Sequence, residues 1–405
     1  MTYRWELLFW LWLAFFFNQA DRQVFSVVLP VLGRDLGLSG VELGLVGSVF
    51  IATTGVMVPI AGFLGDKWSR KKIVALSLLA WSLATFFTGF GSRLSYLIAV
   101  RGIATAAGEA FFGPSAMAML SAEHIKTRAR ALSVFQTSVY AGLVASGWIG
   151  GAIAGWFGWR SAFWIFGLSG LILSVALQAR LRDRPPESNR PKASIIESLK
   201  AIVFVPTARF AALACGAMVF VNVGYLAWMP AYLYERFHLP LGEAGLASML
   251  FHHAFALIGV MLGGVISDRL APGRPQIRLE LQALALFAGA PFLFLLGRTS
   301  TLAIVYFALA GFGFFRGLYD SNTYPAFYSV VSPRFHATAS GLLISFAFLI
   351  GSAAPVLLGK ARDTVGLGSG LSALSAVYFI GGVMAAWGAW KHFRSDFQWA
   401  SAAAA

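Results

Sequence analysis

Charged residues interrupt apolar runs in the first half of the chain, and three of them offer chemistry. Asp21 and Arg22 follow a long apolar stretch, and Glu109 stands among small residues between Ala104 and Met119. A charge near the middle of a membrane span costs ~2.5–3.5 kcal/mol unless it faces a partner or water. Adjacent residues of a helix point about 100° apart, so Asp21 and Arg22 cannot neutralise one another and each needs its own partner. An arginine that can hold an anion and carboxyls that can take up a proton are the chemistry that these residues offer.

The second half carries another pair of deep charges. Arg316 and Asp320 are four residues apart, so they share a helix face and can form an intrahelical ion pair. A role in substrate binding is the alternative interpretation. Tyr319 and Asn322 lie beside them and would suit recognition of hydroxyl groups by hydrogen bonds.

Other polar residues lie in apolar runs. Polar side chains inside membrane spans more often join helices than bind ligands, and both interpretations stay open here. The candidates for substrate binding in this group are Gln19, Gln136, Tyr140, Asn222 and Tyr225.

The elements that must position these residues are transmembrane helices. Of 405 residues, 58% are hydrophobic and 12% charged, whereas about 25% of residues are charged in soluble domains. The apolar runs are long enough to cross a hydrocarbon core as helices, and they lack the alternation of a β-barrel. We therefore expect an all-α membrane protein with twelve spans. The expected spans are 5–33, 41–65, 73–91, 95–121, 131–155, 160–180, 207–235, 243–267, 279–297, 301–330, 338–359 and 370–390.

The basic residues indicate the orientation of these spans. The segments on the side of the N-terminus hold roughly three times as many lysines and arginines as the opposite loops, and the positive-inside rule places both termini in the cytoplasm. The net charge of +14 is thereby explained without nucleic acid. Arg22, Arg101 and Arg316 are the arginines that fall within spans. The partners expected are a small anionic substrate, protons and the lipid bilayer, for a monomer.

Nothing in the sequence indicates an enzyme or a cofactor. There is no Walker motif, nucleophile elbow or metal-ligand cluster, and Cys215 is the only cysteine. We expect no cofactor and no metal site.

The chain divides into two similar halves. Gly62-x-Leu64-x-Asp66 returns as Gly264-x-Ile266-x-Asp268, and six-span repeats of this kind build many secondary transporters. The expected organisation is an N-terminal six-helix bundle over 1–180, a cytoplasmic linker over 181–206, a C-terminal six-helix bundle over 207–392 and a short cytoplasmic tail over 393–405.

The loop after the second span resembles the loop 2–3 signature of the major facilitator superfamily. The stretch 62–72 carries the pattern, with Ser69 where a glycine is usual. The resemblance covers essentially the whole chain and implies the two-half fold named above. It also implies a gating role for the carboxylates and basic residues at these helix ends, which can bond neighbouring helix termini and lock one access state. The gating residues so implied are Gly62, Asp66, Arg70, Lys71, Asp268 and Arg269.

Two further motifs are shared with narrower families. Asn18-x-x-Asp21-Arg22 and Gly108-Glu109-Ala110 resemble the anion:cation symporters, which carry sugar acids and related organic anions with protons. They are also similar to Spinster-like lipid transporters.

The resemblance implies that Asp21 and Glu109 couple to protons while Arg22 binds the substrate. One departure concerns Arg101, which lies eight residues before Glu109 where seven are expected, so that its facing is rotated by about one residue.

The function expected from these motifs is proton-coupled symport of a small organic anion, a sugar acid, by alternating access in the cytoplasmic (inner, plasma) membrane. A Spinster-like lysophospholipid or amphiphile transporter is the alternative. A transport-dead sensor on the same fold is less favoured.

Overall fold

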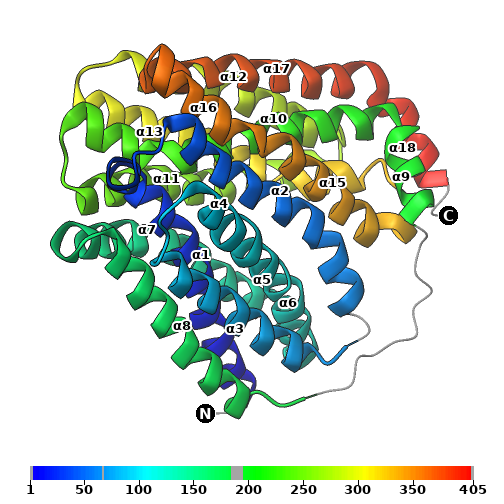
Figure 1. Cartoon of the computed structure of the whole chain (residues 1–405). Helices are drawn as coiled ribbons and strands as arrows, with labels where there is room; N and C mark the ends of the chain where they lie inside the picture. The colour runs from blue at the N-terminus through cyan, green and yellow to red at the C-terminus, as the bar shows by residue number, and fades with distance from the viewer. Residues whose placement is uncertain (1–2, 66–67, 184–194, 403–405) are drawn as a thin grey trace. The chain divides into compact units, whose positions relative to one another are not determined.

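The computed structural model describes residues 3–65, 68–183 and 195–402, and over these ranges the chain is helical with no β-strand (Figure 1). The first six spans are α1 (Tyr3–Leu36), α2 (Gly40–Gly65), α3 (Arg70–Thr88), a segmented helix made of α4 (Leu94–Leu97), η1 (Ile98–Thr105), α5 (Ala106–Ala110) and α6 (Phe112–Glu123), then α7 (Arg128–Phe157) and α8 (Trp159–Arg180).

A short helix, α9 (Ile195–Val203), precedes the second set of six spans. These are α10 (Pro206–Phe237), α11 (Leu241–Leu270), α12 (Ile277–Arg298), α13 (Leu302–Asp320) with α14 (Thr323–Tyr328), η2 (Pro333–Phe335) with α15 (His336–Gly351) and α16 (Ala353–Thr364), and α17 (Leu367–Trp387) with η3 (Gly388–His392) and α18 (Phe393–Ala402).

The helices confirm the predicted membrane protein. Within the described ranges, ten helices are long and apolar enough to cross a membrane. Helix α1 and the segmented helix over 94–123 complete the twelve, and both carry the buried charges that lower their mean hydropathy. The fold class, an all-α membrane protein with twelve spans in two six-helix halves, is the predicted one.

The chain forms two compact units. Unit 1 comprises Met1–Asn189 and Leu226–Met249, and unit 2 comprises Arg190–Tyr225 and Leu250–Ala405. Unit 1 therefore includes the end of α10 and the start of α11. A Cβ atom on Gly245 would overlap the backbone of Gly147 in α7, so only glycine permits this approach.

The interior of unit 1 is built from aromatic contacts between four helices. Trp81 of α3 is fully buried and meets the ring of Phe112 in α6 edge-on, with 5.3 Å between ring centroids. Phe15 of α1 stacks on Phe135 of α7 at 4.8 Å. Since lipid tails are as apolar as these side chains, close packing rather than the hydrophobic effect holds the helices together. The contacts fix α5, the short helix that carries Glu109 between η1 and α6.

Candidate functional site

Unit 1 brings the two sequence-predicted charges of α1 and α5 into contact. The Nε atom of Arg22 donates a hydrogen bond to Oε2 of Glu109, and the two side chains form an ion pair. The Glu109 side chain is 0% exposed and that of Arg22 is 27% exposed. Glu109 Oε1 has no hydrogen-bond partner within the described part of the chain. The carboxylate therefore depends on Arg22 for its compensation, while the guanidinium stays accessible on one side.

Asp21 has a different environment from its neighbour in sequence. It is 1% exposed, and its Oδ2 accepts a hydrogen bond from the hydroxyl of Thr85 in α3 at 3.3 Å. Its Oδ1 has no hydrogen-bond partner among the described residues. The two adjacent charges thus contact separate partners on separate helices, as the 100° between neighbouring helical positions requires.

Arg101 of η1 points to α1 and is buried. Its Nη2 donates to the backbone carbonyl oxygens of Asp21 at 2.7 Å and of Arg22 at 3.3 Å. The guanidinium also lies over the rings of Phe25 and Phe50, at 5.5 and 5.1 Å from their centroids. Arg101 therefore does not reach towards a membrane interface. It holds the backbone of α1 where that helix presents its two charges.

A stretch of π-helix places Arg101 in this position. The eight residues Ile98–Thr105 form η1, and the hydroxyl of Thr105 donates to the carbonyl of Val100, five residues earlier, at 2.9 Å. A π-helix accommodates an extra residue within a helix. The eight-residue spacing between Arg101 and Glu109 predicts a rotated side chain only for a regular α-helix, and the wider turns of η1 absorb the additional residue.

Unit 2 contains a second charged cluster, centred on α13. Arg316 Nη2 lies 3.4 Å from Asp320 Oδ2, which is the intrahelical pair that the four-residue spacing predicts. Arg316 Nη1 also lies 3.1 Å from Nε2 of His252 in α11. Because arginine can only donate, this nitrogen of His252 must accept, and the imidazole is neutral with its proton on Nδ1.

His252 is enclosed by aromatic rings. It is fully buried, and its ring centroid lies 4.7 Å from that of Tyr225 and 4.8 Å from that of Phe312. Its contact with Arg316 joins residues 64 positions apart on different helices. A sequence cannot indicate such a pairing, although a histidine within an apolar span was a signal that a partner existed.

The other predicted binding residues fall into three environments. Gln19 is buried and donates to its neighbour Asn18 at 2.8 Å. Gln136 is exposed and Tyr140 half-buried, both on α7. Those on α10 and around α13 gather in unit 2, where Tyr225, Tyr319 and Asn322 are fully buried and Asn222 is half-buried.

Two of these amides have oxygen atoms with no bonding partner. Neither Asn222 Oδ1 nor Asn322 Oδ1 has a hydrogen-bond partner among the described residues. Buried polar atoms are nearly always bonded in proteins, so each marks a place where a ligand hydroxyl or a water could bind.

The predicted gating segment is described only in part. Asp66 lies outside the described residues, Gly62 is exposed, and Arg70 and Lys71 are half-buried at the start of α3. Ser69, in the place where the signature usually has glycine, caps α3 by accepting from the backbone amide of Lys72 at 3.2 Å. Its φ of −56° needs no glycine, which explains why serine is tolerated.

Ser69 also connects this segment to the residues that follow α8. Its hydroxyl donates to Oδ1 of Asp183 at 2.6 Å. In unit 2, the corresponding Asp268 is 83% exposed and lies 3.9 Å from Arg278, and Arg269 is exposed.

Comparison with known proteins identifies the family. The model of the Major Facilitator Superfamily matches residues 11–355. The chain is 28% identical to protein spinster homolog 1 of Xenopus laevis over 390 residues, which cover 88% of this chain and 72% of that protein. It is 25% identical to the probable sulfoacetate transporter SauU of Cupriavidus necator over 378 residues, covering 87% and 86%. It is 25% identical to the probable L-galactonate transporter of Escherichia coli K12 over 377 residues, covering 87% and 82%.

Solved structures with a similar fold include a bacterial homolog of the human lysosomal transporter Spinster, in an inward-facing and unoccupied conformation. The TM-score is 0.87 and the identity 22%, with 98% of each chain covered. At this identity the likeness concerns the fold alone.

Proposed function

Since the chain belongs to the Major Facilitator Superfamily, it is a multi-pass membrane transporter of a small molecule rather than an enzyme, and we propose that it carries a small organic anion together with protons. A sugar acid is the proposed substrate. Arg22 would couple the movement of substrate to that of protons by exchanging one partner for another.

The ion pair of Arg22 and Glu109 is the observation that carries the proposal. While Glu109 is ionised, its buried carboxylate holds the guanidinium of Arg22. Protonation removes the negative charge, so Arg22 becomes available for the carboxylate of a substrate. Loss of the proton restores the pair and displaces the anion. Proton and substrate therefore reach the site together, which is the requirement for symport.

Neighbouring groups support this exchange. Arg101 holds the α1 backbone through the carbonyls of Asp21 and Arg22, so the guanidinium of Arg22 need only swing between partners. Asp21 is the second proposed proton-coupling carboxyl, because it is buried with one oxygen lacking a bonding partner in the described ranges.

Unit 2 carries a separate set of proposed substrate-binding groups. Arg316 supplies a second positive charge, shared with Asp320 and His252. The amide oxygens of Asn222 and Asn322 suit the hydroxyl groups of a sugar acid. The names of the two bacterial relatives, which specify sulfoacetate and L-galactonate, support an organic anion.

The proposed setting is the cytoplasmic membrane, with both termini in the cytoplasm and a monomer as the working form. The distribution of lysine and arginine supports this orientation. Alternating access would proceed by movement of the halves 1–180 and 207–392, with the linker 181–206 between them. The proposed gating residues would stabilise one of the two access states. They are Gly62, Asp66, Arg70, Lys71, Asp268 and Arg269.

A lysophospholipid or a similar amphiphile is the second candidate substrate. The 28% identity to protein spinster homolog 1 favours it. In that case Arg22 would bind the phosphate of the headgroup, and the same exchange with Glu109 would apply.

Proton uptake or release by the purified full-length protein tests the proposal. Sugar acids and lysophospholipids are added separately to wild type, to Glu109→Gln and to the control Asp35→Asn, which changes a half-exposed carboxyl beyond the expected span 5–33. We expect proton movement with a sugar acid in wild type and in the control, and none in Glu109→Gln. A response only to the lysophospholipid would move the protein to the second candidate. Proton movement in Glu109→Gln equal to wild type would overturn coupling at Glu109.

A further inference from the structure

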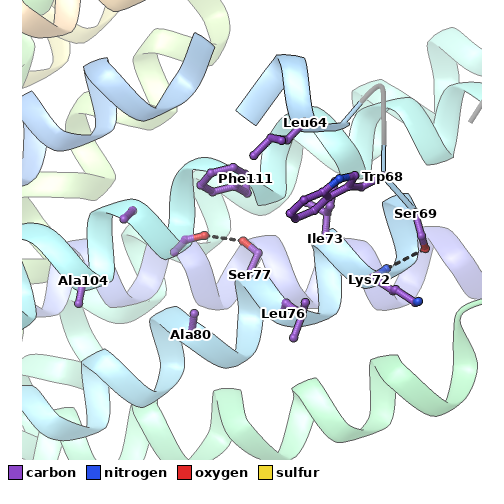
Figure 2. Close-up of a pocket in the computed structure, with 12 residues that line it drawn as sticks. Leu64, Trp68, Ser69, Lys72, Ile73, Leu76, Ser77, Ala80, Ala104 and Phe111 are labelled. Carbon is purple, nitrogen blue, oxygen red and sulfur yellow. Dashed lines mark hydrogen bonds between the residues drawn. The ribbon is translucent and has the colours of Figure 1, made fainter. Parts of the chain in front are cut away.

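Helices α2, α3 and α5, with the end of η1, line a pocket in unit 1 that the proposed transport cycle does not use. Figure 2 shows the residues that line it. Its volume is about 740 Å³, within the range of small-molecule sites. Nearly all of its lining is apolar, and it includes Leu64, Ile73, Leu76, Ala104 and Phe111. A site of this composition would take a hydrocarbon chain.

The pocket has one polar end. Ser69 and Lys72 lie together at the start of α3, and Leu76 and Ala80 follow along the same helix (Figure 2). Positions 72, 76 and 80 are each four residues apart, so they share one face over about 12 Å. A positive charge is thus followed by an apolar track, which is the pattern of an anionic headgroup followed by an acyl chain.

The α3 wall of the pocket is exposed at the surface of the chain. The exposed fractions of Leu76 and Trp68 are 60% and 59%, and Leu79, Leu83 and Phe87 continue the exposed apolar surface of α3. Apolar side chains that a transmembrane helix leaves uncovered by protein are covered by lipid. Molecules that reach this pocket most readily are therefore those of the bilayer.

The charge at the mouth selects among lipids. An acyl chain gains little from leaving one apolar environment for another, so the pocket cannot choose lipids by hydrophobicity. Lys72, with Arg70 and Lys71 beside it, attracts a negative headgroup. In the orientation proposed above, this end of α3 lies at the cytoplasmic leaflet, where anionic lipids are concentrated.

We propose that this pocket binds an anionic phospholipid of the bilayer, with the phosphate at Lys72 and an acyl chain along Leu76 and Ala80. The proposal uses the orientation of the proposed function but not its substrate or its proton coupling.

The occupied pocket would act on the charged site through α5. Ser77 lines the pocket and donates from its hydroxyl to the carbonyl of Gly108, another lining residue, at 2.5 Å. Gly108 directly precedes Glu109. A lipid chain packed against this wall braces α3 and α5 in the arrangement that holds Glu109 against Arg22.

Lipid binding can be measured independently of transport. The full-length protein is purified from vesicles of equal phosphatidylglycerol and phosphatidylcholine content, and the lipids it retains are quantified by mass spectrometry. The variants are Lys72→Gln, which removes the charge, and Ala80→Phe, which fills the apolar track from its exposed side. Lys391→Gln is the matched control, since this lysine lies in η3 of unit 2 over the ring of Trp387 at 4.8 Å.

We expect wild type and Lys391→Gln to retain phosphatidylglycerol over phosphatidylcholine. Lys72→Gln should reduce this preference about five-fold, since one basic residue near an anionic surface contributes ~1 kcal/mol. Ala80→Phe should reduce retention of both lipids. An unchanged preference in Lys72→Gln, or unchanged retention in Ala80→Phe, would overturn the proposal. Displacement of the retained lipid by lysophospholipid but not by added phosphatidylglycerol would also overturn it, and would identify the pocket as an entry site for a single-chain lipid.

Proton uptake and lipid retention are separate measurements, so one can give its expected result while the other does not. A wild-type protein that moves protons but does not prefer phosphatidylglycerol over phosphatidylcholine would refute this inference alone. Retained preference without proton movement would refute the proposed function alone.

Discussion

Removal of Arg22 leaves the carboxylate of Glu109 without its cationic partner. The burial of Glu109 determines how much unfolding free energy is lost. The Glu109 side chain is 0% exposed, and Arg22 is the cation in contact with it. In Arg22→Met the aliphatic volume is kept while the charge is lost. Removing one partner of a buried ion pair costs ~3–5 kcal/mol because the other charge is left uncompensated.

Protonation sets an upper limit to this cost. A carboxyl with a pKa of ~4.3 in water requires ~3.7 kcal/mol to be protonated at pH 7, and this requirement decreases by ~1.4 kcal/mol for each unit by which the pH is lowered. The loss of unfolding free energy in Arg22→Met should therefore be ~3–4 kcal/mol at pH 7 and ~1 kcal/mol at pH 5, relative to wild type at the same pH. The double variant Arg22→Met/Glu109→Gln should recover most of the loss at pH 7.

Unfolding of the full-length protein by SDS in mixed micelles measures these differences, as a double-mutant cycle at both pH values. Arg160 and Asp35 provide the control cycle, because their side chains are 37% and 46% exposed and an exposed pair contributes only ~0.2–1 kcal/mol. The reasoning is refuted if Arg22→Met loses as much stability at pH 5 as at pH 7. It is equally refuted if the coupling of the buried pair does not exceed that of the control.

Three further outcomes follow from individual contacts. Hydrogen bonding to Arg160 lowers the pKa of Asp35. This ion pair therefore stabilises the fold above the ordinary aspartate pKa of ~3.9, and the stabilisation is lost as the pH falls through the lowered value. Asp35→Asn should flatten that part of the pH–stability curve by less than ~1 kcal/mol. Gly108→Ala should destabilise the protein by ~1–3 kcal/mol, because its Cβ would overlap the α3 backbone, whereas Gly113→Ala, which meets nothing within 4 Å, should be near neutral in the same SDS assay. Arg316→Gln should weaken uptake of radiolabelled sugar acid while leaving the stability of the Arg22 pair unchanged, and wild-type uptake would contradict a substrate role for Arg316.

The transmembrane helices were the most predictable part of this molecule. An apolar run in lipid has to satisfy its backbone internally, so its length alone indicates a helix. The expected span 41–65, for example, differs from α2 (Gly40–Gly65) by a single residue. The need of Arg22 for a partner was also predictable, since the cost of a deep charge does not depend on the details of the fold.

Partners between helices were less predictable. Nothing in the spacing of His252 and Arg316 indicates their contact, because it depends on how α11 packs on α13. The same holds for Thr85, which reaches Asp21 from α3. A residue count along one helix also misplaced Arg101, because a periodicity of 3.6 cannot represent a π-helical segment.

The π-helix in the fourth span bears on how sequences of related transporters should be aligned. An additional residue within a membrane helix normally rotates everything beyond it by about 100° and exposes a different face. Here the eight residues of η1 absorb that residue, so Arg101 and Glu109 both point to α1. A relative that lacks one residue within 98–105 could form an unbroken α-helix and still present its arginine at the same place. A one-residue gap at this point would then leave the facing of the arginine and the glutamate unchanged. The same gap a turn later would separate Glu109 from Arg22.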